Sequence, residues 1–167
     1  MIDTSNGVYV YYSNKKLRYA RINDVLCEVP VDNYIYISND EDIDDKCTKW
    51  GNNIIRPITS EEIEYLYEID HYVLCNGRKY KWYHVKKEEN IIQVDADEYE
   101  DVDTKYKYVI HDRDAHFLEV PIDEVTLYET KTYYDKDKFI NEDIREVLSE
   151  ETYLIDEPWW LEESDKN

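Results

Sequence analysis

Residues 72–85 read YVLCNGRKYKWYHV, and this stretch decides the fold class that we expect for the chain. Two runs rich in aromatic and β-branched residues lie on either side of Asn76 and Gly77. These two residue types tolerate the positive φ that both central positions of a type I′ turn require, so the pattern predicts a β-hairpin. An alternative interpretation makes Gly77 the C-cap of a preceding helix. We favour the hairpin because similar strands recur along the chain.

The N-terminal region predicts a second hairpin. Residues 7–13 and 17–22 form two runs with high β propensity, and the short polar segment 14–16 separates them. A further strand is expected at Tyr34–Ile37. The polar and acidic residues 39–45 that follow cannot continue a half-buried strand, so they predict an acidic loop.

Strands that carry basic and aromatic residues recur three times, and each is followed by a turn and an acidic strand. The basic strands are expected at residues 17–22, 80–85 and 106–110, and the acidic strands at residues 28–32, 91–97 and 119–123. Three such units predict a meander of antiparallel hairpins built from degenerate repeats. Chance similarity among strands rich in Tyr and Val is the alternative, and both interpretations stay open.

Two segments have the periodicity of short helices. In the first, Thr59 lies three residues before Glu62, which is the spacing of a capping box. A helix is therefore expected from about Ser60 to Ile69. Its apolar face would contain Ile63, Leu66 and Tyr67.

The second helix is expected from about Asp137 to Leu148, with Asp135 or Asp137 as its N-cap. Its apolar face would contain Ile140, Ile144, Val147 and Leu148. Together with the hairpins, these segments predict an α+β fold made predominantly of antiparallel β-hairpins in a meander-like order, with one or two short helices. We expect a single β-rich domain at residues 1–155 and an acidic C-terminal tail at residues 156–167.

The composition indicates a folded protein with a strongly acidic surface. The chain has 40 Asp and Glu residues against 20 Lys and Arg, a formal net charge of −20, yet 42% of its residues are hydrophobic and 14% aromatic. That is too apolar for a disordered acidic chain. The widely spaced Cys27, Cys47 and Cys75 form no CxxC pair and are expected to be reduced thiols, mostly buried, in a cytoplasmic protein. We find no apolar run long enough for a signal peptide or a membrane span.

The charge favours a basic partner. A surface at −20 repels nucleic acid and anionic membranes, and it attracts the basic clefts that hold nucleic acid. In charge and size the chain resembles the phage-encoded DNA-mimic inhibitors, which include anti-restriction and anti-CRISPR proteins. The resemblance implies a non-enzymatic inhibitor without a cofactor that blocks the nucleic-acid channel of a bacterial nuclease or of another nucleic-acid-binding protein. The expected partner-binding residues are Asp40, Glu41, Asp42, Asp44, Asp45, Asp95, Asp97, Glu98, Glu100, Asp101, Asp103, Trp159 and Trp160.

Two other classes of function stay open. The chain is alternatively an immunity or adaptor protein that docks on a basic surface away from any nucleic-acid site. It is also compatible with a small metal-dependent enzyme that uses the closely spaced His111, Asp112, Asp114 and His116, although a polar hairpin turn is the simpler interpretation of these residues. The chain has only 3 Gly residues and shows none of the common catalytic motifs, so we expect no enzyme activity.

The acidic residues 95–103 alternate as in a calcium-binding loop, but they depart from the EF-hand pattern. Glu100 occupies the position of the turn glycine, and Tyr106 occupies the position of the closing glutamate. No metal site is therefore expected. The adjacent Trp159 and Trp160 would point to opposite faces of an extended segment, so we expect one to pack on the domain and the other to contact the partner.

Repulsion among the carboxylates predicts that salt stabilises the folded chain. Raising the salt concentration from low to moderate should screen this repulsion and raise the melting temperature. Thermal unfolding followed by circular dichroism at several salt concentrations measures the effect. An unchanged midpoint would mean that the charges are already paired or well separated.

Overall fold

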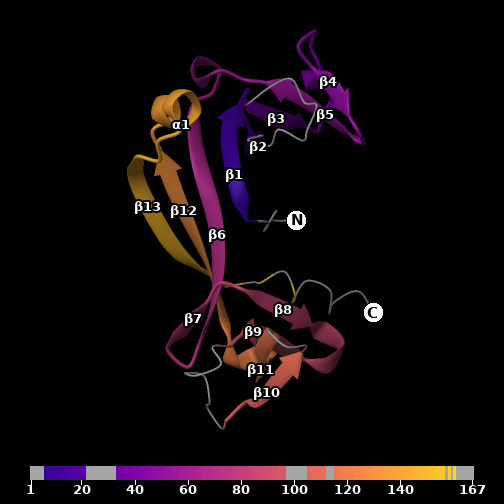
Figure 1. Cartoon of the computed structure of the whole chain (residues 1–167), viewed down its shortest axis with the longest axis vertical. Helices are drawn as coiled ribbons and strands as arrows, with labels where there is room; N and C mark the ends of the chain where they lie inside the picture. Colours follow the sequence, from indigo (N-terminus) through magenta and orange to yellow (C-terminus); the bar gives the residue numbers. More distant parts are fainter. Residues whose placement is uncertain are drawn as a thin grey trace. The chain divides into compact units, whose positions relative to one another are not determined.

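The computed structural model describes residues 6–21, 33–96, 105–111 and 115–156, together with Pro158 and Trp160 (Figure 1). It divides into two compact units. Unit 1 consists of Met1–Thr4, His71–Glu129 and Thr152–Asn167, and unit 2 consists of Ser5–Asp70 and Thr130–Glu151. Whether residues 1–155 behave as one domain stays a prediction. Within the described ranges, no helix is long and apolar enough to cross a bilayer.

One long antiparallel sheet supplies the framework of unit 2, and its strands follow the order β13-β12-β6-β1-β2-β3-β5-β4. Figure 1 shows β13, β12, β6 and β1 side by side. Three of these strands, β6, β12 and β13, contribute residues to both units. The bounds are β1 Gly7–Tyr12, β2 Lys15–Arg21, β3 Asn33–Ile37, β4 Thr48–Trp50, β5 Asn53–Pro57, β6 Tyr65–Cys75, β12 Thr126–Tyr134 and β13 Val147–Ile155.

The N-terminal hairpin is confirmed, with a tighter turn than the sequence suggested. Strands β1 and β2 pair with Tyr12 opposite Lys15, so the turn consists of Ser13 and Asn14 alone. Their φ angles are 48° and 61°, as a type I′ turn requires. The strand expected at Tyr34–Ile37 is also confirmed as β3.

The first predicted helix is wrong beyond its first turn. The capping box of Thr59 and Glu62 is present, but it caps only a 3₁₀ turn, η2, at Ser60–Glu62. Strand β6 then begins at Tyr65. From Tyr67 to Cys75 every second side chain is buried, and this two-residue period outweighs the three- and four-residue spacing that suggested a helix.

The second predicted helix is correct only in its first half. Helix α1 spans Lys136–Glu142, and the side chain of Asp135 caps it by accepting a hydrogen bond from the Lys138 amide. The helix stops because Asp143 adopts a left-handed conformation with a φ of 57°. The remaining residues of the expected apolar face are exposed, and two of them belong to β13 instead. These residues are Ile144, Val147 and Leu148.

The core of unit 2 lies between one face of this sheet and α1. Leu66 and Val10 on the adjacent strands β6 and β1 are fully buried, and so is Ile35 on β3. Phe139 of α1 packs its ring edge-on against Tyr19 at a centroid distance of 5.8 Å. The same cluster contains Leu17, Ile37, Ile58, Ile63, Tyr134 and Ile140.

Tyrosines cover part of the opposite face of the unit 2 sheet. Cross-strand pairing of β1 and β6 stacks Tyr9 on Tyr67 at 5.9 Å and Tyr11 on Tyr65 at 5.0 Å. The ammonium group of Lys16 lies 4.2 Å from the centroid of the Tyr9 ring. Stacked aromatic pairs and cations above their rings stabilise a sheet face beyond the burial of apolar area alone.

Unit 1 contains a four-stranded antiparallel sheet in the order β10-β11-β9-β8. Its strands are β8 Tyr83–Lys86, β9 Ile91–Asp95, β10 Lys107–His111 and β11 Ala115–Pro121. One face of this sheet is buried in a second apolar cluster. This cluster includes Val73, Ile92, Val94, Leu118, Val120, Leu127 and Trp160.

The turn at Asn76 and Gly77 is confirmed, with φ angles of 52° and 79°. The strand expected to follow it is split. Residues Arg78–Tyr80 form β7, which pairs with β6, whereas β8 belongs to the four-stranded sheet. Lys81 and Trp82 lie between the two strands, so the chain leaves one sheet and enters the other at this point.

The fold class is confirmed in its coarse form: most described residues belong to antiparallel strands, with one α-helix and short 3₁₀ turns. The turns are η1 Asp40–Asp42, η2 Ser60–Glu62, η3 Lys87–Glu89 and η4 Ile122–Glu124. The meander of degenerate repeats stays a prediction. The first acidic strand of that scheme, residues 28–32, lies outside the described residues.

Two leucine-to-alanine variants test the core of unit 2. Leu66 is fully buried, so Leu66→Ala should leave a cavity and lower the free energy of unfolding by about 2–5 kcal/mol. Leu148 is 63% exposed, so Leu148→Ala should change it by less than about 0.5 kcal/mol. Urea unfolding of both variants measures the difference. Equal losses would place Leu66 outside the core.

Candidate partner-binding surfaces

The predicted acidic loop is present in unit 2, and internal ion pairs hold it in place. Its first turn, η1, is capped by Asn39, whose side chain accepts a hydrogen bond from the Glu41 amide. Lys15 of β2 pairs with Asp42 at 2.7 Å. Asp44 also pairs with a cation, as described next. Two of the five acidic side chains are therefore neutralised within the protein.

Arg56 of β5 holds the acidic loop in place through its side chain. Its side chain is only 5% exposed, and its guanidinium donates to Asp44 at 2.9 Å and to Glu62 at 2.8 Å. It also donates to the carbonyl of Pro57 at 3.1 Å, and it lies 5.3 Å from the centroid of the Tyr12 ring. A buried guanidinium needs such partners, because an unpaired buried charge is strongly destabilising.

These contacts change the acidity of both carboxylates. The hydrogen bond from Arg56 is the largest cause that lowers the pKa of Asp44 below its ordinary value of 3.8. Burial alone would raise the pKa of Glu62, but hydrogen bonds from Arg56 and from the Thr59 amide bring it below its ordinary value of 4.5. Both groups therefore keep their negative charge well into the acidic range.

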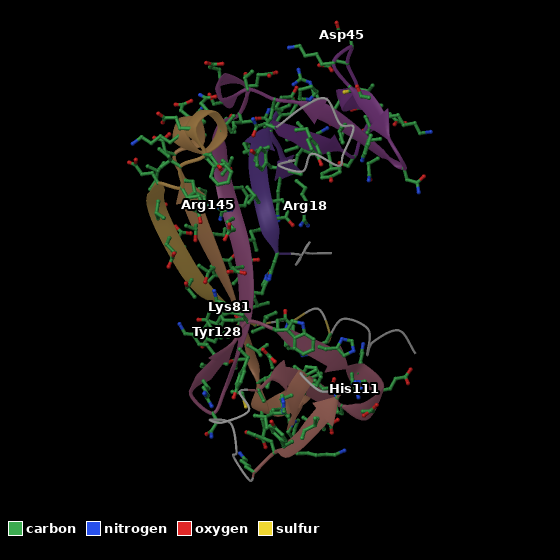
Figure 2. The ribbon with its side chains drawn as sticks, in the orientation of Figure 1. Arg18, Asp45, Lys81, His111, Tyr128 and Arg145 are labelled. Carbon is green, nitrogen blue, oxygen red and sulfur yellow. The ribbon has the colours of Figure 1, made fainter. Side chains whose placement is uncertain are left out.

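The three remaining acids of the loop face outward. Asp40, Glu41 and Asp45 are exposed, and within the described residues none of them makes an ion pair. Figure 2 places Asp45 at the tip of the loop that leads to β4. A 3₁₀ turn has three residues per turn, so Asp40, Glu41 and Asp42 point in different directions. The loop is a cluster of fixed charges and not a single row of acids along a strand.

Only Asp95 of the second acidic set belongs to the described part of the chain, where it ends β9 with an exposed side chain. The other five residues of that set lie outside the described residues. They are Asp97, Glu98, Glu100, Asp101 and Asp103. Trp160 is 3% exposed and packs in the core of unit 1, with its ring edge-on to Tyr83. Trp159 also lies outside the described residues.

Asp95 is part of an exposed cluster that the sequence did not reveal. Trp82 precedes β8, and Phe117 is on β11 directly opposite Asp95. The two rings stack with centroids 5.0 Å apart, and the indole remains 48% exposed. No local pattern marks these residues, because the register of three strands brings them together. We call Trp82, Asp95 and Phe117 the aromatic–acidic cluster.

The register of β10 and β11 separates the two histidines of the candidate metal site. His111 pairs with Ala115, and Ile110 pairs with His116. Because neighbouring residues on a strand point to opposite faces, the two imidazoles lie on opposite faces of the sheet. His116 is hydrogen-bonded to the hydroxyl of Tyr108, and His111 ends its strand with an exposed side chain (Figure 2). This arrangement disfavours a metal site that uses both.

Asp112 and Asp114 of that candidate site lie outside the described residues. Among the residues that the structure does describe, no group of three or more His, Cys, Asp or Glu side chains could hold a metal ion. Cys75 is buried as expected, whereas Cys47 is only half-buried. Cys27 is outside the described ranges.

A short chain of polar groups lies at Tyr106. The hydroxyl of Tyr106 accepts from the Cys75 thiol at 3.5 Å and donates to Glu124 at 2.7 Å. The contact with Cys75 and the hydrogen bond to Glu124 raise the pKa of Tyr106 well above its ordinary value. Lys105 pairs with the same carboxylate at 3.1 Å. A hydroxyl whose pKa is raised holds its proton more firmly. These hydrogen bonds therefore hold Tyr106 in place and do not supply an activated base.

Comparison with known proteins gave no match: no family model, no curated protein and no solved structure resembles the chain.

The ion pairs of Arg56 predict a specific dependence of stability on pH. Groups whose pKa is lowered by folding stabilise the protein above their unfolded pKa, and this stabilisation is lost as the pH falls through the folded pKa. For Asp44 and Glu62 the loss begins below their ordinary values of 3.8 and 4.5. Arg56→Gln should therefore lower stability near neutral pH and lose less stability on acidification than the wild type.

Urea unfolding from about pH 7 to pH 3 measures this difference. Lys49→Gln is the matched control, because Lys49 is exposed and makes no ion pair within the described residues. This control should follow the wild-type curve. Parallel curves for the wild type and Arg56→Gln would contradict the role assigned to the two ion pairs.

Proposed function

We propose that this protein is a non-enzymatic acidic inhibitor that imitates nucleic acid and occupies the basic channel of a bacterial defence nuclease or of another nucleic-acid-binding protein. The acidic loop of unit 2 is the observation that carries the proposal. Two ion pairs fix its backbone, while the carboxylates of Asp40, Glu41 and Asp45 remain exposed.

Exposed carboxylates on an ordered loop suit a surface that competes with phosphates. A loop that is already ordered loses little conformational entropy when a partner binds it. At a net charge of −20, the whole chain also attracts a basic channel from a distance, which speeds association at low salt. The loop then supplies short-range contacts to Lys and Arg side chains that otherwise hold phosphate.

Docking as an immunity or adaptor protein is the second candidate. The same loop would bind a basic surface that holds no nucleic acid. Competition separates the two functions, because only a mimic must leave its partner when nucleic acid fills the channel.

The central experiment neutralises the outward acids and keeps the anchoring ones. Asp42 and Asp44 have internal partners, so replacing them would disturb the loop itself. The triple variant Asp40→Asn, Glu41→Gln, Asp45→Asn avoids this problem. Each single change should have little effect, because the contribution is a sum of weak long-range terms, whereas the triple variant should slow association and flatten its salt dependence.

The matched control neutralises three other exposed acids of unit 2, Glu61, Glu142 and Glu151, and removes the same total charge. It should retain more of the binding than the triple variant. A third variant neutralises the second acidic run, leaving Asp95 intact. It replaces Asp97, Glu98, Glu100, Asp101 and Asp103.

The readout is capture from a bacterial lysate on immobilised protein at low salt, with and without excess duplex DNA, followed by mass spectrometry. Support requires nucleic-acid-binding proteins that are captured by the wild type, displaced by DNA and depleted with the triple variant. Capture that persists in DNA and survives both sets of neutralisation would eliminate the mimic and favour the docking adaptor.

A further inference from the structure

We propose that the aromatic–acidic cluster of unit 1 binds an arginine side chain of a basic protein partner. The cluster lies on the exposed face of the four-stranded sheet, opposite the face that packs in the core. It is built by Asp95 of β9, Phe117 of β11 and Trp82, the residue that precedes β8.

Backbone pairing fixes the three positions. Tyr83 pairs with Val94, so Trp82 lies opposite Asp95, and the Asp95 amide donates to the Trp82 carbonyl at 3.4 Å. On the other side of β9, Asp95 pairs with Phe117. The three side chains therefore share one face of the sheet.

The two rings lean toward each other across the middle strand. Adjacent strands are about 4.8 Å apart, so the backbones of Trp82 and Phe117 are separated by about twice that distance. Their ring centroids are nevertheless only 5.0 Å apart, at an interplanar angle of 25°. The stacked pair thus holds the indole on the same face of the sheet as Asp95, and 48% of Trp82 remains exposed.

A guanidinium is the group that this chemistry fits best. Its planar cation stacks on an aromatic face and pairs with a carboxylate at the same time, and Trp is the strongest aromatic partner for a cation. The side chain of Asp95 is exposed, and it makes no ion pair with another described residue. Exposed Trp side chains that are held rigid are also typical anchors of protein interfaces.

A nucleobase could also stack on an exposed aromatic pair, as in sheets that bind single-stranded nucleic acid. Such sheets combine their rings with a positively charged surface that follows the phosphates. Here the residue on the middle strand, between the positions of Trp82 and Phe117, is an aspartate, and the chain carries −20 overall. The charge therefore favours arginine over a nucleotide.

Nuclear magnetic resonance tests the proposal on the full-length protein. The probe is Nα-acetyl-arginine methylamide, titrated at physiological salt while the indole N–H signals of the four Trp residues are followed. Trp82→Phe and Trp50→Phe assign the two signals of interest. The Trp82 signal should shift and saturate. Trp50, 39% exposed in unit 2 and stacked on no described ring, is the internal control and should not move.

Charge and stacking are separated by matched variants and probes. Asp95→Asn should weaken arginine binding about two- to fivefold, and so should Phe117→Leu, which removes the ring that holds the indole. Glu88→Gln removes an exposed charge elsewhere in unit 1 and should have no effect. The citrulline analogue, which has the same shape without the charge, should not bind.

Three outcomes would overturn the proposal. Equal shifts with arginine and citrulline would show stacking without charge recognition. Binding that Asp95→Asn does not weaken, in a variant whose spectrum is otherwise native, would exclude the carboxylate. A stronger response of Trp82 to single-stranded oligothymidine would assign the cluster to nucleic acid.

The link between this cluster and a nucleic-acid channel rests on the proposed function, but the titration does not. It uses a free arginine derivative and needs no nuclease. If arginine binds while DNA fails to displace captured partners, the arginine site is supported and the nucleic-acid mimic is contradicted. If arginine does not bind while the acidic loop still competes with DNA, the arginine site is contradicted and the nucleic-acid mimic is supported.

Discussion

Alternate burial along β6 is the constraint on which the rest of the structure depends. Leu66 belongs to the apolar cluster of unit 2, and Val73 and Cys75 belong to that of unit 1. A shift of one residue in the pairing of β1 with β6 would put Val10 and Leu66, which now pair on the core face, on opposite faces of the sheet. The stacked tyrosines of the two strands occupy the same register, so aromatic pairing and apolar burial both select one alignment.

Local chemistry made the hairpins predictable, and tertiary pairing decided the rest. Asn76 and Gly77 favour the positive φ angles that their turn requires, so the sequence was sufficient to predict this turn. The capping box at Thr59 was also real, but a cap specifies where a helix can begin and not how far it continues. Beyond it, Leu66 packed in a strand because the sheet offered more burial than one helical turn. The site divides in the same way: the acidic loop was visible as a run of charges, whereas Trp82, Asp95 and Phe117 are distant in sequence and meet only through register.

The two candidate surfaces use their charges differently. In the acidic loop, Lys15 and Arg56 form ion pairs that hold the loop in place, and the outer carboxylates stay exposed. Beside Asp95 the described neighbours are the stacked rings of Trp82 and Phe117, and no ion pair joins its carboxylate to another described residue. Long-range attraction arises from the sum of all the charges, whereas short-range selectivity depends on how each carboxylate is held.

Strand β13 lies at the end of the sheet order, and Val147 and Leu148 on it are 53% and 63% exposed. Such an edge can template the addition of a strand from another copy and so begin aggregation. Glu150 and Glu151 lie on this strand, and like charges on two approaching copies repel. This protection fails near the isoelectric point of about 4.4, where the net charge vanishes. The acidity of the chain thus also opposes aggregation, and purification or storage near that pH would remove this protection.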